Sequence, residues 1–270
     1  MRELRLVHND DGTQPMSNMR LGHVKADYAR WIRNILKTGV DTYVQCVAHP
    51  DICAYATKVG EQLGMGPERS FETANWWHIV QAQKELFTQG TDMLRVATEI
   101  ARKAGCRFLA GIRMSDAHHA FGSGYPKDPL FPRFTHEHPE YRIPGPDGKP
   151  LVTLDYSRAA VRDLRLAIMR EIAHEYPVDG FELDFMRFSQ HFANPATLEQ
   201  IDIMTEFVRQ IRALLDAEAR ARGQGERPVL GARRPPTLAA CAGIGLDPEK
   251  WARQGLIDYL NPADFLWADY

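Results

Sequence analysis

The feature that most constrains the fold of this chain is a regular alternation of short apolar segments with longer segments of helical periodicity. The apolar segments, which have the length of strands, are residues 4–8, 41–47, 107–114, 178–185, 228–233 and 257–260. The helical segments between them are residues 26–37, 91–104, 158–176, 197–222 and 248–254. Glycines such as Gly105 and Gly255 follow helical segments directly, where C-terminal caps belong. Because strict alternation favours parallel strands with right-handed crossovers, the sequence predicts an α/β fold, either an open doubly wound sheet or a TIM-type (β/α)8 barrel.

Six strand segments are two fewer than a complete barrel requires. No internal repeat or low-complexity linker divides the chain, so we expect a single domain over residues 1–270. We expect this domain to be a truncated or incomplete barrel, with its last two strands unaccounted for. If 270 residues is the natural length, the sheet has open strand edges. We then expect these edges to be covered by a rearranged edge or by another chain, as in a homo-oligomer.

The composition excludes several other classes of protein. With 44% hydrophobic and 25% charged residues, the chain can form a sizeable core and is not typical of disordered, collagenous or coiled-coil proteins. A net charge of -2 and a pI near 6.6 give no electrostatic signature of a nucleic-acid or anionic-membrane partner. No apolar run approaches the roughly 20 residues of a membrane span, and the first residues lack the apolar segment of a secretory signal. We therefore expect a soluble, cytoplasmic protein with a small or neutral partner.

The cysteines predict no metal site and no disulfide framework. Cys46, Cys53, Cys106 and Cys241 are scattered, without a CxxC pair, and buried free thiols are the usual state of such residues. We expect no metal and no other cofactor.

Two long connections point to one functional face of the domain. Residues 48–85 and 115–157 leave the second and third predicted strands at their C-terminal ends, and both are far longer than the roughly 2–6 residues of an ordinary βα loop. They carry many aromatic side chains, among them Trp76 and Trp77. Such rings suit the apolar faces of sugars, and packing of the loops onto the sheet is the alternative interpretation.

The segment with the clearest chemical signal is residues 178–188. Alternation along a strand places Phe181 and Leu183 on one face and Glu182 and Asp184 on the other. Two acids on one face of a buried strand are costly unless they are paired or used. Glu182 is either a catalytic carboxylate or part of a buried ion network with neighbouring arginines, whereas Asp184 lies nearer the C-terminal end, where barrel enzymes keep their catalytic groups.

Further polar residues follow the other predicted strands. A second carboxylate, Asp264, comes just after the sixth strand, where it could serve acid/base work on a glycosidic bond. Asp10 and Asp11 after the first strand are candidates too, although turn or cap roles are commoner for such residues. The remaining candidate binding residues at this end are Asn9, Arg113, Asp116, His118, His119, Arg187 and Arg233.

Four stretches of the sequence together resemble a known group of proteins. These stretches are DGFELDFMRF, LDYSRAAVR, RMSDAHH and GLIDYLNPADF. They resemble the uncharacterised family 10 glycosylhydrolase-like (β/α)8 proteins, and the resemblance covers most of the chain. It implies a barrel and carbohydrate chemistry. The acid at the end of the fourth strand and the acid after the sixth are also similar in position to those of retaining α-glycosidase barrels, which implies that Asp184 is the nucleophile and Asp264 the acid/base. Family 18 chitinases carry a proton-donating Glu where this chain has Met186, so their substrate-assisted mechanism is not expected.

The leading hypothesis is a retaining glycoside hydrolase. It requires the two catalytic carboxyl groups to lie about 5–5.5 Å apart, with arginines nearby that keep Asp184 ionised. One alternative is a metal-dependent TIM-barrel hydrolase or isomerase that uses Glu182, Asp184 and His118 or His119 as ligands. Another alternative is a non-catalytic barrel that binds glycans through its loop aromatics.

Overall fold

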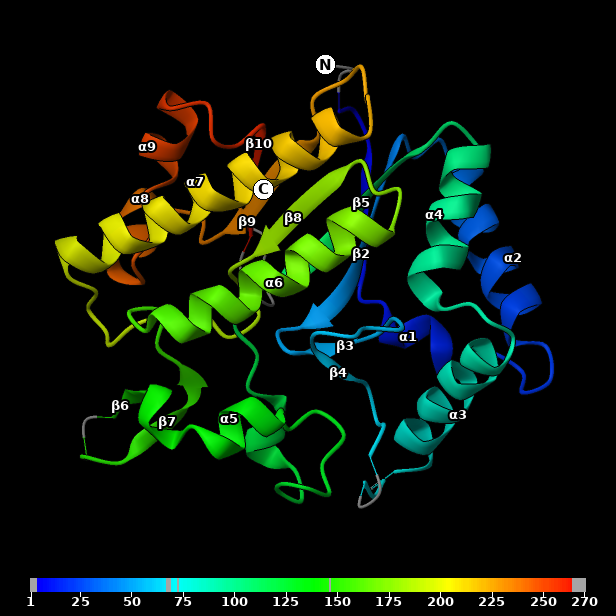
Figure 1. Ribbon diagram of the computed structural model, residues 1–270, viewed down its shortest axis with the longest axis horizontal. Coiled ribbons are helices and arrows are strands. Elements are labelled where there is room, and N and C mark those ends of the chain that lie inside the picture. Colours follow the sequence, from blue (N-terminus) through cyan, green and yellow to red (C-terminus); the bar gives the residue numbers. More distant parts are fainter. Residues whose placement is uncertain (1–3, 67–68, 72, 146, 264–270) are drawn as a thin grey trace.

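The computed structural model describes residues 4–66, 69–71, 73–145 and 147–263. Six parallel strands lie side by side in chain order (Figure 1). They are β1 (Val7–Asp10), β2 (Thr42–His49), β5 (Arg107–Arg113), β8 (Gly180–Asp184), β9 (Val229–Arg234) and β10 (Tyr259–Pro262). The expected parallel α/β sheet is confirmed. Within the described residues β1 pairs with β2 and β10 with β9, and a closed barrel is not confirmed.

Helices follow the strands as the alternation predicts. The main ones are α2 (Val24–Leu36), α4 (Met93–Lys103), α6 (Ala159–Glu175), α7 (Leu198–Ala221) and α9 (Pro248–Arg253). Local sequence explains where two of them begin. The Asp92 side chain accepts from a backbone N–H of the first turn of α4, and Thr197 and Gln200 form a reciprocal capping box at the start of α7. None of the helices in the described part of the chain is both long and apolar enough to span a bilayer.

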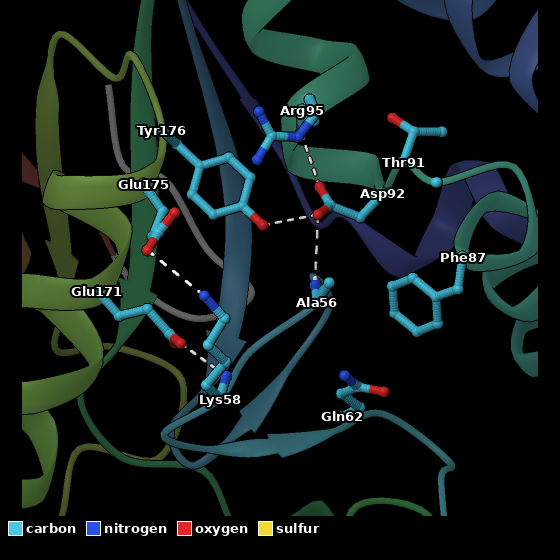
Figure 2. Close-up of a pocket in the computed structure, with 11 residues that line it drawn as sticks. Ala56, Lys58, Gln62, Phe87, Thr91, Asp92, Arg95, Glu171, Glu175 and Tyr176 are labelled. Carbon is cyan, nitrogen blue, oxygen red and sulfur yellow. Dashed lines mark hydrogen bonds and ion pairs between the residues drawn. The ribbon is translucent and has the colours of Figure 1, made fainter.

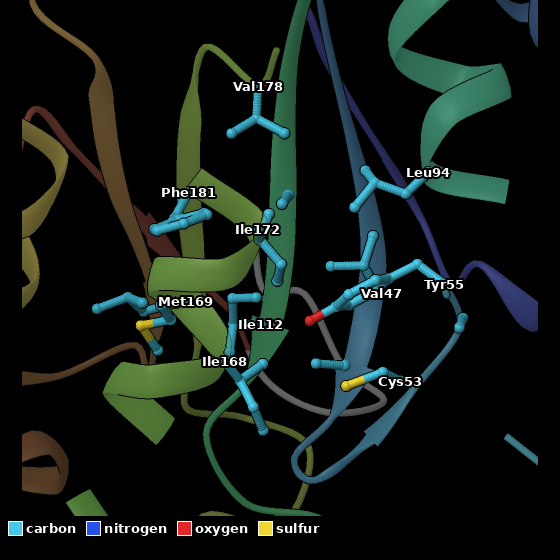
Figure 3. Packing of buried hydrophobic residues seen from close by; sticks show 14 of the residues in the cluster. Val47, Cys53, Tyr55, Leu94, Ile112, Ile168, Met169, Ile172, Val178 and Phe181 are labelled. Carbon is cyan, nitrogen blue, oxygen red and sulfur yellow. The ribbon is translucent and has the colours of Figure 1, made fainter. Parts of the chain in front are cut away.

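The two faces of the sheet have different environments. Phe181, Leu183 and Phe185 of strand β8 and the chain that follows it are fully buried in the main hydrophobic core. Figure 3 shows Phe181 on this face close to Ile172 and Met169 of α6. The alternation predicted for residues 178–185 is therefore confirmed, and the carboxylates of the same strand face the other way.

The opposite face is concave. Asn9 of β1 donates a hydrogen bond to Glu182 of β8, although β2 and β5 lie between these strands. In a flat sheet, strands three places apart would be roughly 14 Å apart, at about 4.8 Å per strand, which is too far for these side chains to meet. The sheet is therefore strongly curved. A small cluster of Val44, Leu109 and Val229 fills the lower part of the concave side.

The long connections both leave the C-terminal ends of strands, at β2 and β5, and contain short elements of their own. After β2 come β3 (Ile52–Cys53), β4 (Glu61–Gln62) and α3 (Ala74–Thr88). After β5 come the 3-10 turns His118–Phe121 and Pro139–Tyr141, α5 (Arg133–Glu137) and the hairpin of β6 (Arg142–Pro144) and β7 (Pro150–Leu154). The smaller helices α1 (Thr13–Met16) and α8 (Leu238–Gly243) follow β1 and β9. These excursions surround the C-terminal edge of the sheet.

Candidate active site

The lower level of the concave face is organised around Glu182. One carboxylate oxygen accepts a hydrogen bond from Asn9 Nδ2 at 2.6 Å and the other from the Tyr259 hydroxyl at 2.6 Å. Glu182 thus connects β1, β8 and β10. Burial raises its pKa above the ordinary value, and the nearby charge of Asp184 acts in the same direction, against the hydrogen bond from Tyr259. Hydrogen bonds with neutral partners therefore hold Glu182, in place of the ion network with arginines that was the structural alternative.

Glycines beside Glu182 make this arrangement possible. Gly111 and Gly231 are its register neighbours on β5 and β9. A Cβ on Gly231 would lie 2.1 Å from the ring of Tyr259, so a side chain there would displace the tyrosine. The absence of a side chain on Gly231 leaves the space in which the Tyr259 ring reaches Glu182.

Asp184 lies one level higher, at the C-terminal end of β8. Arg113, Asp184, Arg233 and Asn261 are register neighbours across four strands and form the rim of the sheet. One oxygen of Asp184 accepts from the backbone N–H of Met186 at 2.8 Å, and the other lies 3.6 Å from Arg233 Nη1. The side chain of Asp184 is 14% exposed. This carboxylate is therefore oriented, charge-compensated and still accessible.

A second cluster on the rim is built around the buried guanidinium of Arg113. Its Nη1 donates to Nδ1 of His49 at 2.7 Å and to Asp116 at 2.8 Å, and its Nη2 contacts Asp11. Asp116 also accepts from the backbone N–H of His118 at 2.9 Å and lies 2.5 Å from its Nδ1. Burial opposes ionisation of Asp116, but the hydrogen bond from His118 and the charge of Arg113 hold its pKa well below the ordinary value.

A cavity of about 180 Å³ opens beside this second cluster. The side chains of Asp11, His49, Arg113, His118 and Arg187 line it together with Trp76 and Ile79 of α3. The described cavity thus combines charged groups from the ends of several strands with an aromatic wall from the long connection after β2. We identify it, together with Glu182, Asp184 and Arg233, as the candidate active site.

A larger cavity of about 410 Å³ lies elsewhere, between α4, α6 and the turn after β3 (Figure 2). Its polar groups are engaged with one another. Tyr176 donates its hydroxyl to Asp92 at 2.6 Å, Arg95 lies over the Tyr176 ring at 4.9 Å, and Lys58 lies 3.6 Å from Glu175. It contains none of the carboxylates of the strand ends, so it is the weaker candidate for catalysis.

Several residues predicted from the sequence converge at the rim. The predicted residues at the rim are Arg113, Asp116, His118, Asp184, Arg187 and Arg233. Asn9 contacts Glu182 below the rim, and Trp76 lines the cavity. His49 and Tyr259 were not predicted from the sequence, and Asp11 was a candidate for which a turn or cap role was the commoner interpretation. Asp11 could have been recognised as a site residue from its position at the end of a predicted strand. His49 lacked this signal, because the apolar run that predicted the second strand ended before it.

Other predicted residues lie apart from the cavity. Asp10 is buried and accepts hydrogen bonds from Tyr43 at 2.6 Å, the Gly12 backbone at 2.8 Å and Trp31 at 3.1 Å, which is a structural role. The His119 ring stacks on Phe131 at 4.6 Å. Trp77 is exposed on α3 and is not among the residues that line the cavity. Asp264 lies outside the described residues.

Comparison with known proteins supports the fold. No family model matches the sequence, and no curated protein matches it. A cycloisomaltooligosaccharide glucanotransferase from Paenibacillus sp. has a similar structure, with a TM-score of 0.51 and 10% identity over 98% of this chain and 35% of that one. A family 36 alpha-galactosidase from Geobacillus stearothermophilus has a TM-score of 0.50 and 11% identity over 97% of this chain and 31% of that one.

A maltogenic alpha-amylase from Thermotoga neapolitana also matches, with a TM-score of 0.45 and 15% identity over 84% of this chain and 45% of that one. The chain therefore spans between about a third and a half of the length of these three proteins, at 35%, 31% and 45%. The structural neighbours are glycoside hydrolases and related enzymes of low sequence identity. This chain has a glycoside-hydrolase-like α/β fold with a parallel sheet.

Proposed function

We propose that this protein is a retaining glycoside hydrolase, with Asp184 as the nucleophile and Asp264 as the acid/base. The observation that carries the proposal is the position of Asp184, an accessible carboxylate at the C-terminal end of a central strand, compensated by Arg233 at 3.6 Å. Barrel enzymes keep their catalytic groups at this end of the strands. The similarity of the fold to glycoside hydrolases supports the same class, and membership of the family 10 glycosylhydrolase-like group is part of the proposal.

The proposed reaction proceeds in two steps through a covalent intermediate. A carboxylate oxygen of Asp184 bonds to the anomeric carbon while the glycosidic bond breaks, and Asp264 transfers its proton to the leaving oxygen. Asp264 then removes a proton from water, whose oxygen bonds to the anomeric carbon as the bond to Asp184 breaks. The sugar is released with its configuration retained.

The surroundings of Asp184 suit this role. The N–H of Met186 at 2.8 Å directs one of its oxygens, so the carboxylate loses little orientational freedom when it attacks. Arg233 balances the negative charge of Asp184 before attack. In this proposal Glu182 is a positioning residue, because its two hydrogen bonds hold β1 and β10 against β8 directly below Asp184.

The alternatives differ in what the same residues must do. A metal centre of Glu182, Asp184 and a histidine is disfavoured, because Glu182 is engaged by Asn9 and Tyr259 and His118 by Asp116. Across the described ranges, no group of three or more metal-binding side chains has the arrangement of a metal site. A non-catalytic glycan-binding protein would use the same cavity and is distinguished by the absence of turnover.

The proposal is tested with a panel of aryl glycosides and natural glycans, comparing the parent protein with Asp184→Asn. This near-isosteric change removes the nucleophile, so we expect turnover to fall by several orders of magnitude while the far-UV circular dichroism spectrum is kept. The matched control is Asp202→Asn, an exposed carboxylate on α7 that pairs with Lys250 and should leave turnover unchanged. Equal turnover by the parent and Asp184→Asn would refute the assignment, and glycan binding without turnover by either protein would favour the binding function.

A further inference from the structure

Two arginines in the cavity converge on one carboxylate. Arg113 contacts Asp11 through Nη2, and Arg187 Nη2 lies 3.9 Å from the same carboxylate. These three are the carboxylate and guanidinium side chains among the residues that line the cavity. The pair of guanidiniums therefore already holds one carboxylate, and a planar guanidinium is the side chain best suited to bind such a group.

The two partners in this contact are not equally fixed. The side chain of Arg113 is only 5% exposed and is anchored from behind by Asp116 and His49, so it does not move when Asp11 leaves. Asp11 is 40% exposed and lies just past the end of β1, next to Gly12 with its φ of 78°. Asp11 is therefore the carboxylate that a ligand can replace.

The electrostatic environment of Arg187 includes a second guanidinium, that of Arg113. Burial lowers the pKa of Arg187, and the charge of Arg113 lowers it further because the two guanidiniums repel each other, whereas the charges of Asp11, Asp116 and Asp184 raise it. A ligand carboxylate placed between them relieves this repulsion. Charge-assisted hydrogen bonds of this kind are roughly twice as strong as neutral ones.

The size and the other walls of the cavity limit what the rest of the ligand can be. At about 180 Å³ it is smaller than the roughly 300–1,000 Å³ of sites that enclose a drug-sized molecule, so it suits one end of a longer ligand. The remaining lining supplies an indole ring from Trp76 and polar groups from Asn75, Gln14 and Ser17. A ring face together with amide and hydroxyl groups is the chemistry that recognises a sugar.

We propose that this cavity binds a hexuronic acid unit, with its carboxylate between Arg113 and Arg187, and that the preferred glycan is therefore acidic. The inference rests on the proposed glycosidase function, which it deepens by naming the substrate class. In the complex, the uronate carboxylate takes the place of Asp11 on the two guanidiniums. Trp76 packs against the sugar ring, and the unit lies at the end of the glycan that enters the cavity.

Binding of methyl glucuronide and methyl glucoside to the full chain tests the proposal, measured by isothermal titration calorimetry and ligand-observed NMR. These ligands differ in the carboxylate. We expect the glucuronide to bind at least about tenfold more tightly, and the preference to vanish in Arg187→Gln, since tenfold corresponds to one charge-assisted hydrogen bond. The matched control is Arg209→Gln, which removes an exposed arginine of α7 and should keep the preference.

Asp11→Asn separates this model from a purely structural role for the cluster. If the ligand carboxylate replaces Asp11, removing that competing charge leaves glucuronide affinity unchanged or increases it. Loss of glucuronide binding in Asp11→Asn, or equal affinity of the parent protein for both ligands, overturns the inference. Turnover of neutral glycosides that does not depend on Arg187 overturns it while leaving the proposed function intact. Glucuronide binding without turnover supports the site and argues against the hydrolase.

Discussion

Replacement of Glu182 by alanine tests whether this side chain holds the concave face together. The substitution removes the acceptor of two hydrogen bonds, from Asn9 Nδ2 and from the Tyr259 hydroxyl, both 2.6 Å long. The hydroxyl of the half-buried Tyr259 would lose its acceptor at a cost of about 1–3 kcal/mol, whereas the exposed Asn9 amide can bond to water, so we expect Glu182→Ala to lower the free energy of unfolding by about 1–3 kcal/mol. Glutamine is the matched control. Its oxygen accepts from one partner and its amide N–H donates to the oxygen of the other, so its cost should stay below about 1 kcal/mol.

The assay is urea denaturation at pH 7, followed by circular dichroism and tryptophan fluorescence. Glu182→Ala within about 1 kcal/mol of the parent protein would refute the role assigned to these hydrogen bonds. The same experiment across pH checks the ionisation of Glu182. Because its pKa is raised in the folded state, its favourable contribution is complete below the unfolded pKa, near 4.3, and is lost as pH rises through the folded value. Glu182→Gln should therefore gain stability relative to the parent protein between pH 4 and pH 7.

Three further substitutions have defined outcomes, each measured by urea denaturation. Asp10→Ala should lower the free energy of unfolding by about 2–4 kcal/mol, because it leaves the buried Tyr43 hydroxyl and other donors without an acceptor. A loss of less than about 1 kcal/mol would contradict the structural role of Asp10. Burial lowers the pKa of His191 to about 4, so its stabilising contribution is present above pH 6.5 and is lost toward pH 4. Relative to a His191→Phe variant, the parent protein should lose about 3 kcal/mol of stability over this range, and equal slopes for the two proteins would rule this out. Gly231→Ala should destabilise by about 1–3 kcal/mol, because its Cβ would lie 2.1 Å from the Tyr259 ring, and an unchanged denaturation midpoint would contradict that packing.

The strands and the faces of their side chains were predictable because both depend on local periodicity. The alternation in residues 178–185 was sufficient to separate Phe181 from Glu182, and the alternation of strands with helices was sufficient to predict a parallel sheet. The turn chemistry that begins helices, such as the capping box at Thr197, is equally local.

The contacts of the site could not be predicted in the same way. Asn9 and Glu182 are 173 residues apart, and they meet only because the sheet curves, which no local pattern specifies. Asp11 and Arg113 are 102 residues apart, and their contact depends on where a short loop after β1 places a carboxylate. The assignment of Asp11 to a turn was reasonable from sequence, since aspartate before glycine commonly occupies one. Its contacts with the two arginines became visible only in three dimensions.

Chemical trapping of the covalent intermediate tests the assignment of Asp184 as the nucleophile. An activated 2-deoxy-2-fluoro glycoside of a sugar that the protein turns over slows both steps of a retaining mechanism, so the covalent intermediate accumulates. We predict that intact-mass and peptide analysis find one glycosyl group on Asp184, and none in Asp184→Asn. A glycosyl group on another residue, or steady turnover without any covalent adduct, would contradict the assignment of Asp184 as the nucleophile.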